Sequence, residues 1–115
     1  MTIDELAGRL GEVTILDVRS EGEYAGTAGY PCCARQGHIP GARHLDVGRL
    51  GDARTVEELR ELVGEPVGAE IVTYCHSGSR SQLAASVLES AGYRARNYVG
   101  SWHEWAARDD LPAES

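Results

Sequence analysis

Residues 71–81 read Ile-Val-Thr-Tyr-Cys-His-Ser-Gly-Ser-Arg-Ser, and they join a strand pattern to a helix pattern through a very short loop. The β-branched run 71–73 predicts a buried strand that ends near Cys75. A loop rich in serine and glycine follows, and an amphipathic helix begins after it. Cys75 is therefore expected at the carboxyl end of a strand, where loop amides and the helix dipole favour an anion. A thiol in such a place becomes largely thiolate at neutral pH, which predicts a nucleophilic cysteine.

The rest of the chain alternates strand and helix patterns. Strands are expected at residues 13–18, 42–45, 70–74 and 94–99. Helix starts carry five capping-box patterns: Thr2-x-x-Glu5, Ser20-x-x-Glu23, Thr55-x-x-Glu58, Ser79-x-x-Gln82 and Ser101-x-x-Glu104. Helix ends are expected at Gly11, Gly64 and Gly92. This alternation predicts an α/β fold with a central, mostly parallel sheet, in which ligands bind beyond the carboxyl ends of the strands.

Length and charge restrict the function classes. At 115 residues there is room for one hydrophobic core, so residues 1–115 are expected to form a single domain. The net charge of −7 and the lack of a basic stretch with interleaved aromatics argue against nucleic-acid binding. All 11 cationic side chains are arginine, which excludes lysine Schiff-base chemistry in this chain.

The expected compartment is the cytoplasm. The first residues carry acids and no apolar run, so they do not resemble a signal peptide. No stretch approaches the ~18 apolar residues of a membrane span, and no membrane association is expected. The three cysteines, one of them in a site that needs a reduced thiol, favour a reducing environment.

The loop after Cys75 supplies the candidate anion-binding residues. Arg80, in the first turn of the predicted helix, either donates to an anion in the loop or forms a surface salt bridge. His76 is a general acid or a solvent-facing loop residue. The remaining candidates are hydrogen-bond donors and the glycine between them, Ser77, Gly78, Ser79 and Ser81. Ser79 has the alternative role of helix N-cap.

Four stretches of the chain resemble signatures of the rhodanese (sulfurtransferase) family. They are Leu16-Asp17-Val18-Arg19 with Glu23-Tyr24, Gly37-His38-Ile39-Pro40-Gly41-Ala42, Tyr74-Cys75-His76-Ser77-Gly78-Ser79-Arg80-Ser81, and Tyr98-Val99-Gly100-Ser101-Trp102-His103-Glu104-Trp105. The last resembles the C-terminal signature of the catalytic domains of two-domain thiosulfate and 3-mercaptopyruvate sulfurtransferases. The four occur in the family's order over nearly the whole chain. The resemblance implies a rhodanese-like three-layer α/β/α fold in which the catalytic domain stands alone.

The resemblance also implies a reaction. The Cys75 thiolate attacks the sulfane sulfur of a donor such as thiosulfate, forms a persulfide and releases sulfite. Cyanide, a small thiol or a protein thiol then accepts the sulfur, which gives double-displacement kinetics. The expected partners are therefore a small-molecule donor and one of these acceptors. No metal and no cofactor beyond the covalent persulfide on Cys75 is expected.

Two other functions are consistent with the same cysteine. One is a persulfide carrier or interaction module that receives sulfur from a protein and turns over small donors poorly. The other is a cysteine-based phosphatase or arsenate reductase. Loop length disfavours the second, because four residues separate Cys75 from Arg80 where related phosphatases have five. The smaller ring suits a sulfur atom better than a tetrahedral phosphate or arsenate.

Three further side chains are candidates for the substrate side of the site: Arg19, Arg35 and Trp102. Arg19 has the structural alternative of pairing with Asp17, and Trp102 is expected to wall the mouth of the site. Glu23 departs from the family pattern, because some two-domain members have at this position an arginine that holds thiosulfate. Local positive charge for an anionic donor would then come from Arg80 and Arg35.

Cys32 and Cys33 are adjacent in residues 25–36, an irregular segment expected to be functional or mobile. Adjacent cysteines form a disulfide with each other only under strain. They are interpreted either as two surface or half-buried thiols, or as a pair of which one reaches Cys75 to resolve its persulfide or to protect it as a disulfide. Their spacing to any histidine does not match zinc-binding motifs, so no metal site is expected there.

Overall fold

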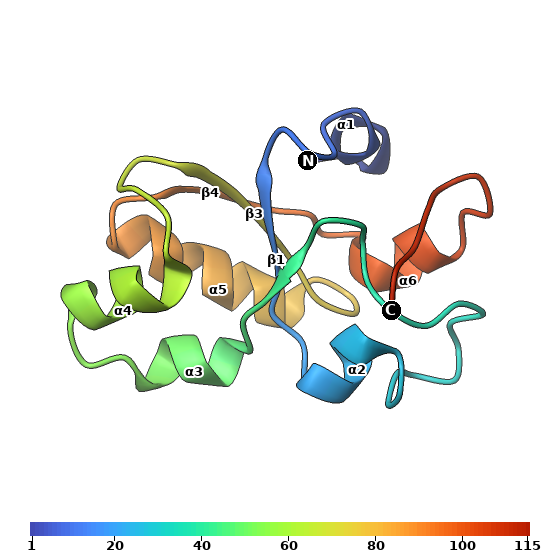
Figure 1. Ribbon diagram of the computed structural model, residues 1–115, viewed down its shortest axis with the longest axis horizontal. Helices are drawn as coiled ribbons and strands as arrows, with labels where there is room; N and C mark the ends of the chain where they lie inside the picture. Colours follow the sequence, from blue (N-terminus) through green and yellow to red (C-terminus); the bar gives the residue numbers. More distant parts are fainter.

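The computed structural model describes all 115 residues and is built around a four-stranded parallel sheet in the order β2-β1-β3-β4 (Figure 1). The strands are β1 (Thr14–Asp17), β2 (Arg43–His44), β3 (Glu70–Tyr74) and β4 (Arg94–Asn97). The expected strand positions are confirmed. The bounds of β3 are as predicted, and the other three strands are shorter than predicted by two residues each. In the central pair, Asp17 lies opposite Tyr74, so both strands end at the same edge.

Helices cover both faces of the sheet, because the central strands are apolar on both sides. Leu16 and Ile71 face one core with α3 (Val47–Asp52), α4 (Val56–Val63) and α5 (Ser79–Ser90). Ile15 and Val72 face the other core with α1 (Ile3–Ala7) and α6 (Ser101–Ala106). The short α2 (Glu21–Ala25) follows β1 (Figure 1). The predicted three-layer α/β/α architecture is confirmed, and the sheet is entirely parallel.

The capping boxes have mixed outcomes. Those of Thr2 and Ser20 form completely, with both reciprocal hydrogen bonds present. Thr55 accepts from the amide of Glu58, but the Glu58 carboxylate accepts from Arg54 instead of closing the box. These three serine and threonine side chains do begin helices as predicted.

The predicted boxes of Ser79 and Ser101 are wrong. Each serine is the first helical residue, the N-caps are Gly78 and Gly100, and no side chain caps either helix. The Ser101 hydroxyl is instead bonded to the backbone of Cys75 and Tyr98, so it has no role at its own helix start.

Helix ends also differ from the glycine pattern. Gly64 is the left-handed C-cap of α4, as expected. The first helix ends earlier than Gly11, at Ala7, and the following residues form turns. The C-cap of α5 is Ala91, one residue before the predicted Gly92. No helix is both long and apolar enough to cross a membrane.

Candidate active site

Cys75 directly follows β3 at the carboxyl edge of the sheet, and three residues separate it from the first residue of α5. The loop closes tightly because Gly78 has a backbone φ of 101°, in the left-handed region. A Cβ atom at this position would lie 2.7 Å from the carbonyl oxygen of Val99. Glycine is therefore required for the sharp return of the chain from strand to helix.

Hydrogen-bond donors converge on the sulfur of Cys75. The amide of Gly78 lies 3.1 Å from Sγ, and the amide and hydroxyl of Ser81 lie 3.4 Å and 3.3 Å away. Ser81 is completely buried in the first turn of α5, and Cys75 is only 1% exposed. A sulfur anion at this point is thus held by donors from both the loop and the helix.

The pKa of Cys75 reflects two opposing effects. Burial raises it, because a thiolate loses hydration in the protein interior. The hydroxyl and amide of Ser81 and the amides of Gly78 and Ser77 lower it, and together they outweigh burial. The net pKa lies below the ordinary value of 9.0, so Cys75 is more readily deprotonated than an ordinary cysteine although it is buried.

The backbone of Cys75 is fixed by Ser101. The Ser101 hydroxyl accepts from the Cys75 amide at 3.0 Å and donates to the carbonyl of Tyr98 at 2.9 Å. Ser101 is fully buried and has a φ of 54°, unusual for a residue with a side chain. The sequence pattern suggested a helix cap and missed this positioning role. The sequence signal that could have indicated this role is the position of Ser101 shortly after a strand, within the C-terminal signature.

Arg80 does not reach the sulfur. Its guanidinium forms a two-point ion pair with the Glu23 carboxylate, at 2.9 Å and 3.1 Å. Burial raises the pKa of Glu23, but the bonds from Arg80 and from Ser20 lower it to about 2. The prediction that Arg80 donates to an anion in the loop is corrected: its Nη1 and Nη2 groups are paired with a carboxylate of α2. Glu23 both closes its capping box and holds Arg80, a contact that the sequence did not indicate.

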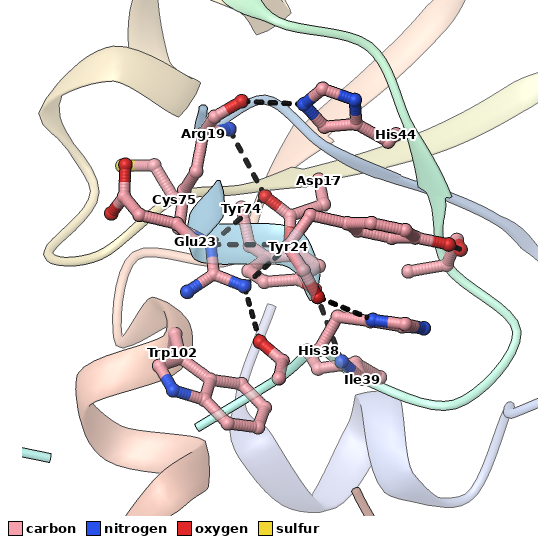
Figure 2. Close-up of polar contacts among 12 residues, drawn as sticks. Asp17, Arg19, Glu23, Tyr24, His38, Ile39, His44, Tyr74, Cys75 and Trp102 are labelled. Carbon is pink, nitrogen blue, oxygen red and sulfur yellow. Dashed lines mark hydrogen bonds and ion pairs between the residues drawn. The ribbon is translucent and has the colours of Figure 1, made fainter. Parts of the chain in front are cut away.

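Arg19 is a buried structural residue and not part of a substrate surface. It is 1% exposed, pairs with Asp17 through Nε and Nη2, and also donates to the carbonyl of Gly37 at 2.6 Å (Figure 2). The Asp17 carboxylate also accepts from the Tyr74 hydroxyl at 2.7 Å. The guanidinium lies near the rings of Tyr74 and Trp102. The alternative of an Arg19–Asp17 pair is therefore the one observed.

Arg35 and Trp102 are also corrected. Arg35 donates to four backbone carbonyls at the end of α6 and beyond, those of Trp105, Ala106, Arg108 and Leu111. These four hydrogen bonds hold the C-terminal segment, and they engage all three nitrogens of the guanidinium. Trp102 is 1% exposed, and its indole donates to the carbonyl of Arg35, so it belongs to the core and does not wall the mouth.

The remaining loop residues have separate roles. The ring of His76 packs at a tilt of 31° against that of Tyr30, with centroids 4.1 Å apart. Burial and then the charge of His103 lower the pKa of His76. Ser77 contributes its amide toward the sulfur, whereas its side chain is exposed. Ser79 is exposed, and its hydroxyl forms no hydrogen bond. The serine side chain that contacts the sulfur is that of Ser81.

A second group of reactive side chains lies beside the loop. Cys32, Cys33, His76 and His103 place their sulfur and ring nitrogen atoms within 4.8 Å of one another. All three cysteines are free thiols, and neither Cys32 nor Cys33 is hydrogen-bonded to the sulfur of Cys75. The sequence missed this cluster because its members come from three separate segments.

Comparison with known proteins agrees with this geometry. The model of the family described as rhodanese-like domain matches residues 2–108. The chain belongs to the rhodanese family. Within it, the chain is 33% identical to the thiosulfate sulfurtransferase of Pseudomonas aeruginosa over 98% of its length, and 36% identical to that of Azotobacter vinelandii over 96%. It spans less than half of those rhodanese relatives, 45% and 44% of their lengths.

Solved rhodanese-like structures resemble the chain closely. A probable thiosulfate sulfurtransferase superposes with a TM-score of 0.87 at 43% identity, covering 100% of this chain and 47% of the other. A variant of the enzyme EanB, solved with a cysteine persulfide and ergothioneine, gives 0.84 at 28% identity and is covered over 27% of its length. A rhodanese-like domain protein from Staphylococcus aureus gives 0.71 at 28% identity and is covered over 97%.

Proposed function

We propose that this rhodanese domain is a sulfurtransferase that carries a sulfane sulfur as a persulfide on Cys75. The observation that supports it best is the convergence of the Gly78 amide and both Ser81 donors on one buried sulfur. Such a cradle stabilises the thiolate before transfer and the persulfide anion after it. Relatives named thiosulfate sulfurtransferase, and the persulfide in the EanB structure, favour the same chemistry.

In the first step, the Cys75 thiolate attacks the sulfane sulfur of a donor such as thiosulfate. A sulfur–sulfur bond forms on Cys75 as the donor's own sulfur–sulfur bond breaks, and sulfite leaves with the electron pair. In the second step, cyanide or a thiolate attacks the terminal sulfur, and Cys75 leaves as thiolate. Neither step needs an external oxidant. Both steps use only residues of the active-site loop and α5.

A persulfide carrier is the second candidate, and the arginine side chains favour it. The guanidiniums of Arg19, Arg35 and Arg80 are engaged with Asp17, backbone carbonyls and Glu23 respectively. An anionic small donor therefore meets no free cation in the loop, and the net charge of −7 repels it. A persulfide delivered on a protein or on a larger thiol needs no such cation.

Cysteine-based phosphatase or arsenate reductase chemistry has less support. The four-residue spacing between Cys75 and Arg80 makes a small ring, and Arg80 is paired with Glu23. A phosphate or arsenate needs a free guanidinium to neutralise its oxygens. Hydrolysis of an aryl phosphate by the protein would revive this alternative.

A donor panel tests the proposal. The reduced protein is incubated with thiosulfate, 3-mercaptopyruvate or glutathione persulfide, and intact and peptide mass spectrometry score the added sulfur. We expect one sulfur atom on Cys75 and none in Cys75→Ser, with thiocyanate released when cyanide is added. Labelling by glutathione persulfide alone would favour the carrier. Thiocyanate production by Cys75→Ser at the wild-type rate would rule out the proposed nucleophile.

A further inference from the structure

Four side chains able to bind a metal meet beside the active-site loop. Cys32 and Cys33 come from the segment between α2 and β2, His76 follows Cys75, and His103 lies on α6. Figure 1 shows the first of these segments, coloured cyan, running beside α6. Two sulfurs and two imidazoles are the ligand set of many tetrahedral zinc sites.

The distances match the edges of a zinc tetrahedron. Zinc lies about 2.3 Å from sulfur and about 2.0–2.1 Å from nitrogen, so sulfur–sulfur edges are about 3.8 Å and sulfur–nitrogen edges about 3.6 Å. The Sγ atoms of Cys32 and Cys33 are 3.9 Å apart. The Cys32 sulfur lies 3.7 Å from Nε2 of His76 and 3.8 Å from Nδ1 of His103. One imidazole binds an ion through a single nitrogen, so Nε2 of His76 is the ligand atom, and the 3.9 Å contact of the Cys33 sulfur with Nδ1 is not an edge of the tetrahedron. All four ligand atoms lie within 4.8 Å of one another, so the Cys33 sulfur closes the set after a small adjustment of its side chain.

The four side chains are available to bind an ion, and the arginines whose charges act on His76, Arg19 and Arg80, are each paired with a carboxylate. No acid or arginine is hydrogen-bonded to these four side chains. The sulfur and nitrogen atoms that would bind the ion form hydrogen-bond contacts only within this group. Two thiols that lose their protons on binding would neutralise a divalent ion. Cys33 is buried, whereas Cys32 and His103 are exposed, which gives the ion a path from solvent. The net charge of −7 favours its approach.

We infer that Cys32, Cys33, His76 and His103 form a Zn²⁺ site that joins three segments next to the sulfur-transfer loop. Because His76 is the neighbour of Cys75, the ion would tie the loop to residues 26–42 and to α6. The inference is independent of the sulfurtransferase proposal, since zinc binding is measurable whether or not Cys75 transfers sulfur.

Zinc titration of the reduced, chelator-treated full-length protein tests the site. In competition with a chromophoric chelator, we expect one equivalent of Zn²⁺ to bind with a Kd below ~1 µM. Structural zinc peptides bind more tightly than this limit. Replacing zinc by Co²⁺ should give the absorption bands of tetrahedral cobalt with thiolate charge transfer. Absence of one-to-one binding by the wild-type protein would overturn the inference.

Variants identify the ligands. Cys32→Ser, Cys33→Ser and His103→Ala should each weaken Zn²⁺ binding at least tenfold, whereas Cys75→Ser should bind as the wild type does. Unchanged affinity in Cys32→Ser or Cys33→Ser, or loss of binding in Cys75→Ser, would refute this ligand set. If a variant fails to fold, alkylation of the wild-type protein remains informative. Zn²⁺ should then protect the peptide that contains Cys32 and Cys33, and lack of protection would refute the site.

Discussion

Arg80, in the first turn of the helix after the active-site loop, is held by the carboxylate of Glu23 on α2. The side chain of Glu23 is 8% exposed and that of Arg80 33%, so the pair is largely screened from solvent. The contact joins two elements that flank the sulfur-binding loop. Arg80 is the arginine nearest to Cys75 in the sequence, and its pairing with Glu23 keeps it from binding an anionic sulfur donor directly.

Glu23→Gln should release Arg80 and cost stability. Loss of the ion pair leaves a partly buried guanidinium without a charged partner, and we expect a decrease of about 1–3 kcal/mol in the free energy of unfolding. With Arg80 free, the KM for thiosulfate should fall relative to the wild type. Urea unfolding and steady-state kinetics measure the two effects. Glu21→Gln, an exposed acid on the same helix, is the matched control and should change neither.

The same carboxylate predicts a pH dependence of stability. The pKa of Glu23 is about 2 in the folded protein and near its ordinary 4.5 when unfolded. Between these values the unfolded state binds more protons, so the stability from this group is complete above pH ~4.5 and is lost as the pH falls toward 2. Urea midpoints of Glu23→Gln should therefore fall less steeply than those of the wild type below pH 4.5. Parallel curves for the two proteins would contradict this assignment.

Ser81→Ala should raise the pKa of Cys75. The substitution removes one donor to the sulfur and leaves the amide of Ser81 in place. A hydrogen bond to a charged group contributes about 1.5–3 kcal/mol, so a shift of about one to two pH units is expected. The rate of iodoacetamide alkylation against pH, measured on chelator-treated protein, gives the midpoint. Ser79→Ala removes a hydroxyl that forms no hydrogen bond, and its midpoint should equal that of the wild type.

Ser101 should be a positioning residue for the loop. Ser101→Ala deletes the acceptor of the Cys75 amide and the donor to Tyr98, and we expect a loss of about 1–3 kcal/mol in stability with slower persulfide formation. Ser101→Gly loses the same bonds but accommodates the φ of 54° without strain, so it should be more stable than Ser101→Ala by about 1 kcal/mol. Thermal unfolding compares them. Equal stability of the two variants would show that the backbone here is unstrained.

Local patterns predicted the fold because each was decided by neighbouring residues. The strand 70–74 and the boxes of Thr2 and Ser20 depend on apolar runs and on residues three apart, and they form as expected. Ser79 and Ser101 have the same spacing but begin helices without capping them. At these two helix starts the tight turn of Gly78 and the bond to Cys75 override the local preference.

The site was predicted only as far as the loop itself. Cys75 and the amides around it follow from one contiguous stretch. The pairing of Arg19 with Asp17 was one of two alternatives that the sequence left open, because the two residues are close in the chain. The partners of Arg80 and Arg35 lie across the fold or in the backbone, and no spacing rule reveals that these guanidinium groups are engaged. A resolving role for Cys32 or Cys33 toward the persulfide stays a prediction. Detection of a disulfide-linked peptide joining either residue to Cys75 would support it.

The contact of α6 with the active-site loop has an electrostatic consequence. The carbonyls of Cys75 and His76 accept hydrogen bonds from the amides of Trp102 and His103, at 2.9 Å and 3.0 Å. In a planar trans peptide the carbonyl and the next amide point in opposite directions, so fixing the oxygens toward α6 turns the following amides away from it. The amide that follows the His76 carbonyl is that of Ser77, which is directed toward the sulfur. Helix α6 thus orients a peptide dipole that acts on the thiol, although α6 itself donates no hydrogen bond to the sulfur. Reactivity of the thiol is set in part by backbone more than twenty residues downstream.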